Sequence, residues 1–196
     1  MAAEAFLFDL DGTIWDSHPW LAGVAAKGNQ RREAQYLTAL RARRPAATLL
    51  RNAGISRAAF ARACGDGCAL PLYPEAATTL DRLAQRGVLL GAVTNLPMWL
   101  ARPMLDGLGL SQRFGSLVTY ERTSRRKPHP DPLLLSLEEL AADSGPNAWY
   151  VGDSATDARA AMAAGMSFAW VSWGYESTPP ATTDLVVGRF SELLDI

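Results

Sequence analysis

The sequence has few of the residues that build zinc sites, disulfide frameworks or membrane spans. It contains two cysteines and two histidines among 196 residues. A structural zinc site needs four ligands, and the scarcity of both residue types disfavours one. No secretory signal precedes Cys64 and Cys68, so we expect reduced thiols rather than a disulfide. No apolar run approaches membrane-spanning length. We therefore expect a cytoplasmic protein without a membrane partner.

Charge is balanced over the whole chain but unevenly distributed along it. The net charge of −1 gives no overall attraction for nucleic acid, so we expect no nucleic-acid partner. Residues 16–73 contain nine basic and three acidic residues, a balance of +6, which leaves −7 for the remainder. A basic segment within an acidic body suggests an anionic ligand, although a solvated helical face explains the same charges.

Strand and helix patterns alternate along most of the chain. Apolar runs predict strands at 5–8, 88–93, 117–119, 148–151, 168–171 and 184–187. Between them, helical spacing predicts a helix from Pro74 to Arg86 with proline at its first position, a helix from Pro97 to Leu105, and a terminal helix at 190–194. Residues 16–69 show helical signals alone. The sequence therefore predicts an α/β fold with a mostly parallel sheet flanked by helices, plus an all-helical insertion.

Two acids, Asp9 and Asp11, follow the first predicted strand directly. Residues i and i+2 of a strand point the same way, roughly 6–7 Å apart, so two acids in this pattern repel each other unless a cation lies between them. A turn at a strand end is the plain alternative. A calcium loop is excluded, because the sixth position is Ile14 rather than glycine and the twelfth is Trp20.

Other polar residues also follow predicted strands. Ligands of parallel sheets bind beyond the carboxyl ends of the strands, so we expect these residues to converge at one edge. Each residue has an ordinary explanation as well. Thr94 and Asn95 are typical helix caps, Lys127 could be a surface cation, and acids such as Asp153 and Asp157 pair favourably with a helix dipole. The residues are Thr94, Asn95, Lys127, Asp153 and Asp157.

Together these motifs resemble the haloacid-dehalogenase-like hydrolase superfamily, and the resemblance covers essentially the whole chain. The phosphoglycolate-phosphatase-like branch is the most similar. The family implies a Rossmann-like core, here residues 1–15 and 74–196, and a small helical first-position cap at 16–73. The motifs that carry the resemblance are Asp-Leu-Asp-Gly-Thr at 9–13, Thr94-Asn95, Lys127-Pro128 and Gly152-Asp153-Ser154 with Asp157.

The resemblance also implies roles for these residues. Asp9 would be the nucleophile, and Asp11 would protonate the leaving oxygen and then activate water. Lys127 would neutralise charge and bind phosphate together with Thr94 and Asn95. Mg²⁺ would be held by Asp9, the backbone carbonyl of Asp11, and Asp153. Asp157 would position Lys127 or a metal-bound water.

We therefore expect a Mg²⁺-dependent phosphatase of a small phosphorylated metabolite, either phosphoglycolate-like or a sugar phosphate. Asp11 favours phosphoryl transfer, because the dehalogenases of the family lack this second acid. A sugar-phosphate mutase shares all these motifs and stays an alternative. A non-catalytic binding protein on the same fold is a further alternative.

Overall fold

The computed structural model describes residues 3–65 and 68–196, and the chain divides into two compact units. The first unit comprises Met1–Trp15, Leu72–Asn95 and Gln112–Ile196; the second comprises Asp16–Pro71 and Leu96–Ser111. The second unit therefore begins at the first residue of the predicted insertion. Its first segment ends at Pro71, two residues before the predicted end of the insertion at residue 73. The unit also includes Leu96–Ser111, a segment that the sequence pattern assigned to the core.

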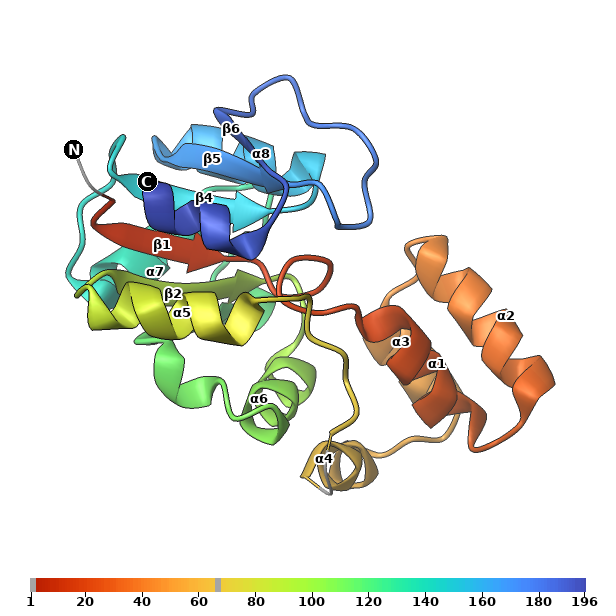
Figure 1. Cartoon of the computed structure of the whole chain (residues 1–196). Helices are drawn as coiled ribbons and strands as arrows, with labels where there is room; N and C mark the ends of the chain where they lie inside the picture. Colours follow the sequence, from red (N-terminus) through yellow and green to blue (C-terminus); the bar gives the residue numbers. More distant parts are fainter. Residues whose placement is uncertain (1–2, 66–67) are drawn as a thin grey trace. The chain divides into compact units, whose positions relative to one another are not determined.

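The first unit is built on a six-stranded parallel sheet, which confirms the predicted α/β class (Figure 1). The strand order is β3-β2-β1-β4-β5-β6. The strands are β1 (Ala5–Phe8), β2 (Leu89–Thr94), β3 (Ser116–Thr119), β4 (Ala148–Gly152), β5 (Ser167–Val171) and β6 (Leu185–Val187).

The register of the central strands aligns their carboxyl ends. Phe8 of β1 pairs with Ala92 of β2 and with Val151 of β4. All four residues of β1 are buried, because neighbouring strands flank it and helices cover both faces of the sheet. The polar residues that follow β1, β2 and β4 consequently emerge at one edge of the sheet.

Helices cover both faces of this sheet (Figure 1). One face carries α5 (Ala76–Gln85) and the 3₁₀ helix η3 (Phe190–Asp195), and the other carries α7 (Asp131–Leu140) and α8 (Ala155–Ala164). Short 3₁₀ turns occupy Ser111–Arg113 (η1) and Tyr120–Arg122 (η2). The predicted terminal helix is thus 3₁₀, since apolar residues three positions apart satisfy a three-residue turn as well as an α-helix.

The start of α5 differs from the prediction that Pro74 is its first residue. The helix begins at Ala76, because Glu75 has a left-handed backbone with φ of 65° and the Ala76 N–H donates to the Tyr73 carbonyl in a turn. A Glu75 carboxylate oxygen also accepts a hydrogen bond from the Ser191 N–H at 3.1 Å. This contact ties the start of α5 to η3.

The second unit is helical, as the spacing in residues 16–69 predicts. It contains α1 (Ser17–Ala26), α2 (Gln30–Arg41), α3 (Ala46–Asn52), α4 (Arg57–Gly65) and α6 (Met98–Gly107). The Phe60 ring packs edge-on against Trp20 at 5.6 Å and against Trp99 at 5.5 Å, which joins α1, α4 and α6. At Gly107 a Cβ atom would lie 2.3 Å from the Cys64 carbonyl oxygen, so α4 and α6 meet without a side chain between them.

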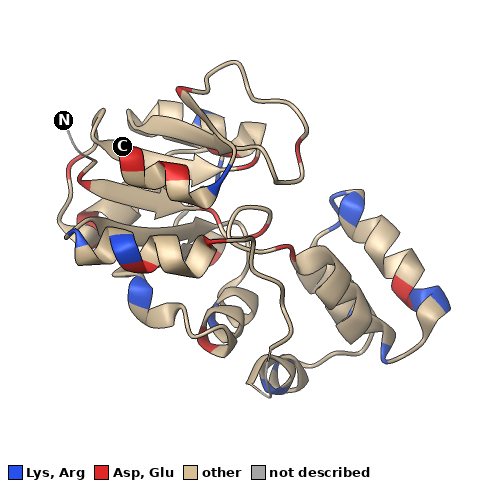
Figure 2. Cartoon of the chain, viewed as in Figure 1, with Lys and Arg blue, Asp and Glu red and all other residues tan. Residues whose placement is uncertain are grey.

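Basic residues of the second unit gather around α2. Lys and Arg colouring marks both ends of this helix (Figure 2), since Arg31 and Arg32 lie in its first turn and Arg41 is its last residue. These side chains belong to exposed positions, and Leu40 is the one residue of α2 that is fully buried. Among the helices described, none combines the length and the apolar character that a membrane span requires.

Candidate active site

Asp9 and Asp11 lie on the turn that follows β1. The Asp9 N–H donates to the Val151 carbonyl at 2.9 Å, which continues the pairing of β1 with β4 and leaves Asp9 7% exposed. Gly12, with φ of 90°, donates from its N–H to the Trp15 carbonyl at 2.8 Å and closes the turn. Asp11 is therefore held at the edge of the sheet, partly exposed.

Lys127 is buried among oxygen atoms from four segments of the chain. Its Nζ lies 2.8 Å from Asp9 Oδ1 and 2.7 Å from Asp157 Oδ1. It also lies 3.1 Å from the Val93 carbonyl oxygen and 2.6 Å from the Tyr150 hydroxyl. An ammonium group needs such partners to be buried, because an unpaired charge in the interior is strongly unfavourable.

Burial and the neighbouring charges shift the pKa values of Asp9, Lys127 and Tyr150. Burial raises the pKa of Asp9 to about 6; the charge of Asp157 adds to this shift, and Lys127 opposes it. Burial alone would lower the pKa of Lys127, but the carboxylates of Asp157 and Asp9 outweigh it, so the pKa is raised and the ammonium stays charged. Burial, followed by the charge of Asp157, also raises the pKa of Tyr150, whose hydroxyl stays protonated.

Asp153 and Asp157 lie at the junction of β4 with α8. Ser154 caps α8, and its N–H donates to Asp157 Oδ2 at 3.1 Å in a capping box. Gly152 is required here, because a Cβ atom would lie 2.7 Å from the Asp157 Cβ. Asp153 is 2% exposed, and its Oδ2 accepts a hydrogen bond from the Tyr175 N–H at 2.7 Å.

Three of these carboxylates form a compact acidic group. Asp9, Asp153 and Asp157 each offer an oxygen atom, and the three atoms lie within 4.8 Å of one another. The Asp11 carboxylate, in contrast, lies at the rim, where its Oδ1 accepts a hydrogen bond from the Tyr175 hydroxyl at 2.8 Å. Three carboxylates beside one ammonium leave an excess of two negative charges, which a divalent cation would neutralise.

Thr94 and Asn95 follow β2 at the same edge. Thr94 is the last residue of β2 and is buried, whereas Asn95 is exposed. The Asn95 Nδ2 donates to the Lys127 carbonyl at 3.1 Å, which ties the end of β2 to the loop that carries Lys127. The structure thus brings all seven predicted residues to one edge of the sheet, with Asp11 and Asn95 at its rim.

Sequence reasoning missed two aromatic residues of this cluster, Tyr150 and Tyr175. Both contribute hydroxyl groups that contact the predicted acids or the lysine. Tyr150 is internal to β4, where an aromatic side chain indicates core packing. Tyr175 carried a usable signal, because it follows β5 at the edge where the other strand ends bear polar groups.

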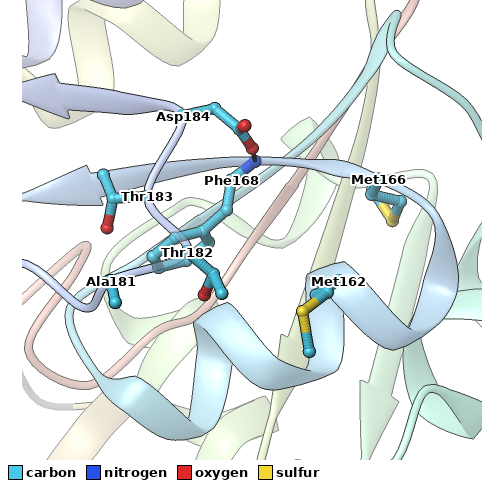
Figure 3. Close-up of a pocket in the computed structure, with 7 residues that line it drawn as sticks. All are labelled: Met162, Met166, Phe168, Ala181, Thr182, Thr183 and Asp184. Atoms are coloured by element: carbon cyan, nitrogen blue, oxygen red, sulfur yellow. Dashed lines mark hydrogen bonds between the residues drawn. The ribbon is translucent and has the colours of Figure 1, made fainter.

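A pocket elsewhere in the first unit contains none of the predicted site residues (Figure 3). It has a volume of about 360 Å³ and is lined by Met162, Met166, Phe168 and residues 181–184. Phe168 stands near the start of β5, whereas the acidic group lies where strands end. The pocket is therefore separate from the candidate site.

Comparisons with known proteins agree with the family that the sequence motifs resemble. The family model for haloacid dehalogenase-like hydrolases matches residues 3–165. A phosphoglycolate phosphatase from Pectobacterium atrosepticum is 32% identical over 100% of this chain and 92% of that protein.

Solved structures with the same fold include a predicted phosphoglycolate phosphatase from Haemophilus somnus, with a TM-score of 0.75 and 22% identity over 98% of this chain and 97% of that one. CbbY from Rhodobacter sphaeroides, solved in complex with phosphate, has a TM-score of 0.72 and 22% identity over 97% of this chain and 96% of that one. A mutant of CbbY has been solved in complex with xylulose-(1,5)bisphosphate. These findings confirm the resemblance drawn from the motifs: the chain belongs to the haloacid dehalogenase-like hydrolases, on the branch that contains the phosphoglycolate phosphatases.

Proposed function

We propose that the protein is a Mg²⁺-dependent phosphatase that hydrolyses a small phosphorylated metabolite through an aspartyl-phosphate on Asp9. The observation that carries this proposal is the buried Lys127 ammonium, 2.8 Å from Asp9 and 2.7 Å from Asp157. A carboxylate that attacks a phosphate dianion meets repulsion of about 4 kcal/mol per charge pair at contact in a partly screened site. A fixed cation beside the nucleophile offsets that repulsion.

Each acid of the first motif has a separate role in the proposed reaction. Asp9 attacks phosphorus and forms the acyl-phosphate, while Asp11 gives a proton to the leaving oxygen. In the second half-reaction Asp11 takes a proton from the attacking water. Burial of Asp9 beside Lys127 and the partial exposure of Asp11 at the rim support this division.

The residues present fit a divalent cation with a preference for oxygen ligands. We assign its ligands to the carboxylates of Asp9 and Asp153 and to the backbone carbonyl of Asp11. Asp157 supports the site instead, because Lys127 contacts one of its oxygens and Ser154 the other. When bound, Mg²⁺ would neutralise the charge of the phosphoryl oxygens and polarise the phosphorus.

The remaining residues bind and select the substrate. We assign the phosphoryl oxygens to Thr94, Asn95 and Lys127, at the end of β2 and beside it. We assign the role of a cap to residues 16–71, whose basic side chains would attract an anionic substrate. Specificity would then depend on this segment.

Two substrate classes follow from the relatives. The similar proteins named phosphoglycolate phosphatases favour a small phosphorylated acid, and the CbbY complexes with phosphate and a bisphosphate sugar favour a sugar phosphate. The phosphatase names also favour hydrolysis over the mutase reaction that shares the same motifs.

The test is phosphate release from a panel of phosphate esters with Mg²⁺, comparing the wild-type protein with Asp9→Asn. The panel contains phosphoglycolate, several sugar phosphates and a hexose 1-phosphate, whose conversion to the 6-phosphate would reveal a mutase. We expect Asp9→Asn to lose turnover by at least about a thousandfold while its circular dichroism spectrum is unchanged. Asp143→Asn, at an exposed position, is the control. Turnover retained by Asp9→Asn would exclude the aspartyl-phosphate.

A further inference from the structure

The loop that follows β5 contacts both the acidic group and the turn after β1. The Trp173 indole N–H donates to the Thr13 carbonyl at 3.1 Å, and its ring packs on Phe190 at 4.9 Å. Two residues later, Tyr175 donates twice: its backbone N–H to Asp153 Oδ2 at 2.7 Å, and its hydroxyl to Asp11 Oδ1 at 2.8 Å. One residue therefore joins an acid of the β4–α8 junction to an acid of the first motif.

Two glycines make this approach possible. A Cβ atom at Gly174 would lie 2.2 Å from the Asp153 Cβ. A Cβ atom at Gly12 would lie 2.6 Å from Asp153 Oδ2 and 2.8 Å from the Tyr175 ring. Contacts this short do not occur for real side chains, so both backbones meet Asp153 only as glycine. The Tyr175 ring thus packs closely over Gly12, and the backbone just before it, at Gly174, packs closely on Asp153.

We propose that Tyr175 is a positioning residue that holds the Asp11 carboxyl group in place for proton transfer. This inference rests on the proposed function, in which Asp11 exchanges protons with the leaving group and with water. Asp11 lies at the rim, where the hydrogen bond from the Tyr175 hydroxyl restricts the orientation of its carboxyl group. Proton transfer depends steeply on donor–acceptor geometry, so a fixed hydroxyl partner accelerates it.

The proton balance of the reaction leaves Tyr175 unchanged. In the first half-reaction the bond from Asp9 oxygen to phosphorus forms, the bond from phosphorus to the leaving oxygen breaks, and that oxygen receives the Asp11 proton. In the second, water attacks phosphorus, its proton returns to Asp11, and the Asp9–phosphorus bond breaks to release phosphate. The Tyr175 hydroxyl keeps its own proton and its hydrogen bond to Asp11 throughout.

The experiment compares alkyl and aryl phosphate esters in wild-type protein and in Tyr175→Phe. The substitution removes the hydroxyl and keeps the ring and the N–H bond to Asp153. An alkoxide leaving group needs a proton, whereas p-nitrophenolate departs as a stable anion. Because kcat/KM covers the steps up to phosphoryl transfer, we expect it to fall on the order of tenfold to a hundredfold for phosphoglycolate and less than about threefold for p-nitrophenyl phosphate.

Three controls separate positioning from a general structural effect. The inhibition constant of inorganic phosphate and the melting temperature of Tyr175→Phe should match those of the wild type, which shows an intact binding site. Tyr120→Phe, at an exposed position, should behave as wild type on both esters. In an Asp11→Asn background, Tyr175→Phe should cause no further loss, since the hydroxyl acts through Asp11.

Selective loss on the alkyl ester, absent in the Asp11→Asn background, would support the inference. Equal loss on both esters, no loss on either, or the same loss in both backgrounds would overturn it while leaving the phosphatase assignment intact. Absence of turnover by the wild-type protein on every ester would overturn the proposed function, and this inference with it.

Discussion

Lys127 Nζ lies 2.8 Å from Asp9 Oδ1, although 118 residues separate the two in sequence. Both side chains are almost fully buried, with 3% of the lysine and 11% of the aspartate side chain exposed. Removing either charge therefore leaves the other in a medium that screens it poorly. The pair links the chemistry of the site to the stability of the fold.

The first prediction concerns Lys127→Met, which shortens the side chain by one atom, keeps it unbranched and removes its charge. We expect kcat for phosphate release to fall by at least about a hundredfold, because the nucleophile loses its fixed counter-charge. We also expect the free energy of unfolding to fall by about 3–5 kcal/mol, because Asp9 and Asp157 are left buried beside each other. Steady-state assays and urea denaturation without Mg²⁺ measure the two effects.

Arg125→Met is the matched control for Lys127→Met. Arg125 lies two residues earlier, its side chain is 60% exposed, and it pairs with Asp131 outside the acidic group. We expect a change in stability below about 1 kcal/mol and wild-type kcat. Equal effects of the two substitutions would contradict the importance assigned to the Lys127 position.

The second prediction concerns metal binding by the folded protein. A cation that binds only the native state raises stability by about 2.7 kcal/mol at a concentration a hundredfold above its dissociation constant. We expect Mg²⁺ to raise the melting temperature of the wild-type protein and EDTA to reverse the change. Asp153→Asn should abolish the shift, whereas Asp143→Asn, at an exposed position, should preserve it. A full shift in Asp153→Asn would remove Asp153 from the ligand set.

The third prediction concerns Gly174→Ala. The added Cβ would overlap Asp153, so the loop or the acid must move, and we expect a loss of about 1–3 kcal/mol in the free energy of unfolding together with weaker Mg²⁺ binding. Gly188→Ala is the control, because its Cβ would meet nothing closer than Glu192 Oε1 at 3.6 Å. Urea denaturation and calorimetric titration with Mg²⁺ give both quantities, and an unaffected Gly174→Ala protein would refute the close packing.

The fourth prediction concerns the reactivity of Cys64 at different pH values. Burial, assisted by Cys68, raises the pKa of its thiol from 9.0 to about 12. At pH 8 the reactive thiolate is then about a thousandfold scarcer than in the unfolded chain. We expect alkylation of Cys64 by iodoacetamide to be slow in the native protein, to increase steadily as the pH rises, and to become rapid in guanidinium.

Mass spectrometry of a Cys68→Ala protein follows this thiol alone. Burial is the main cause of the shift, so its direction should persist in that variant. Alkylation at pH 8 that is as fast in the native as in the unfolded protein would show that the thiol is accessible.

Much of the fold was predictable, because apolar runs and turn residues mark most elements locally. The run Ala5–Phe8 indicates a strand buried on both faces, and it is the centre of the sheet. The start of α5 was not predictable, since the left-handed backbone of Glu75 accompanies contacts with Tyr73 and with the distant Ser191. The grouping of 96–111 with the inserted helices depends on the packing of Phe60 against Trp99, which no local pattern reveals.

The convergence of the candidate site was predictable from one topological rule. Parallel strands end at the same edge, so residues that follow β1, β2 and β4 meet. The partners within the site were not predictable in the same way. Asn95 contacts the Lys127 carbonyl, and Asp11 contacts Tyr175, through geometry that only the folded loops define.

The surroundings of Lys127 also make the activity of the site depend on the folding of distant segments. Oxygen atoms reach this ammonium from the end of β1, from β2, from β4 and from α8, so no contiguous fragment shorter than the span from residue 9 to residue 157 holds all of them. Recovery of turnover during refolding would consequently report the pairing of β2, β1 and β4 and the docking of α8, later than any spectroscopic signal from the separate helices.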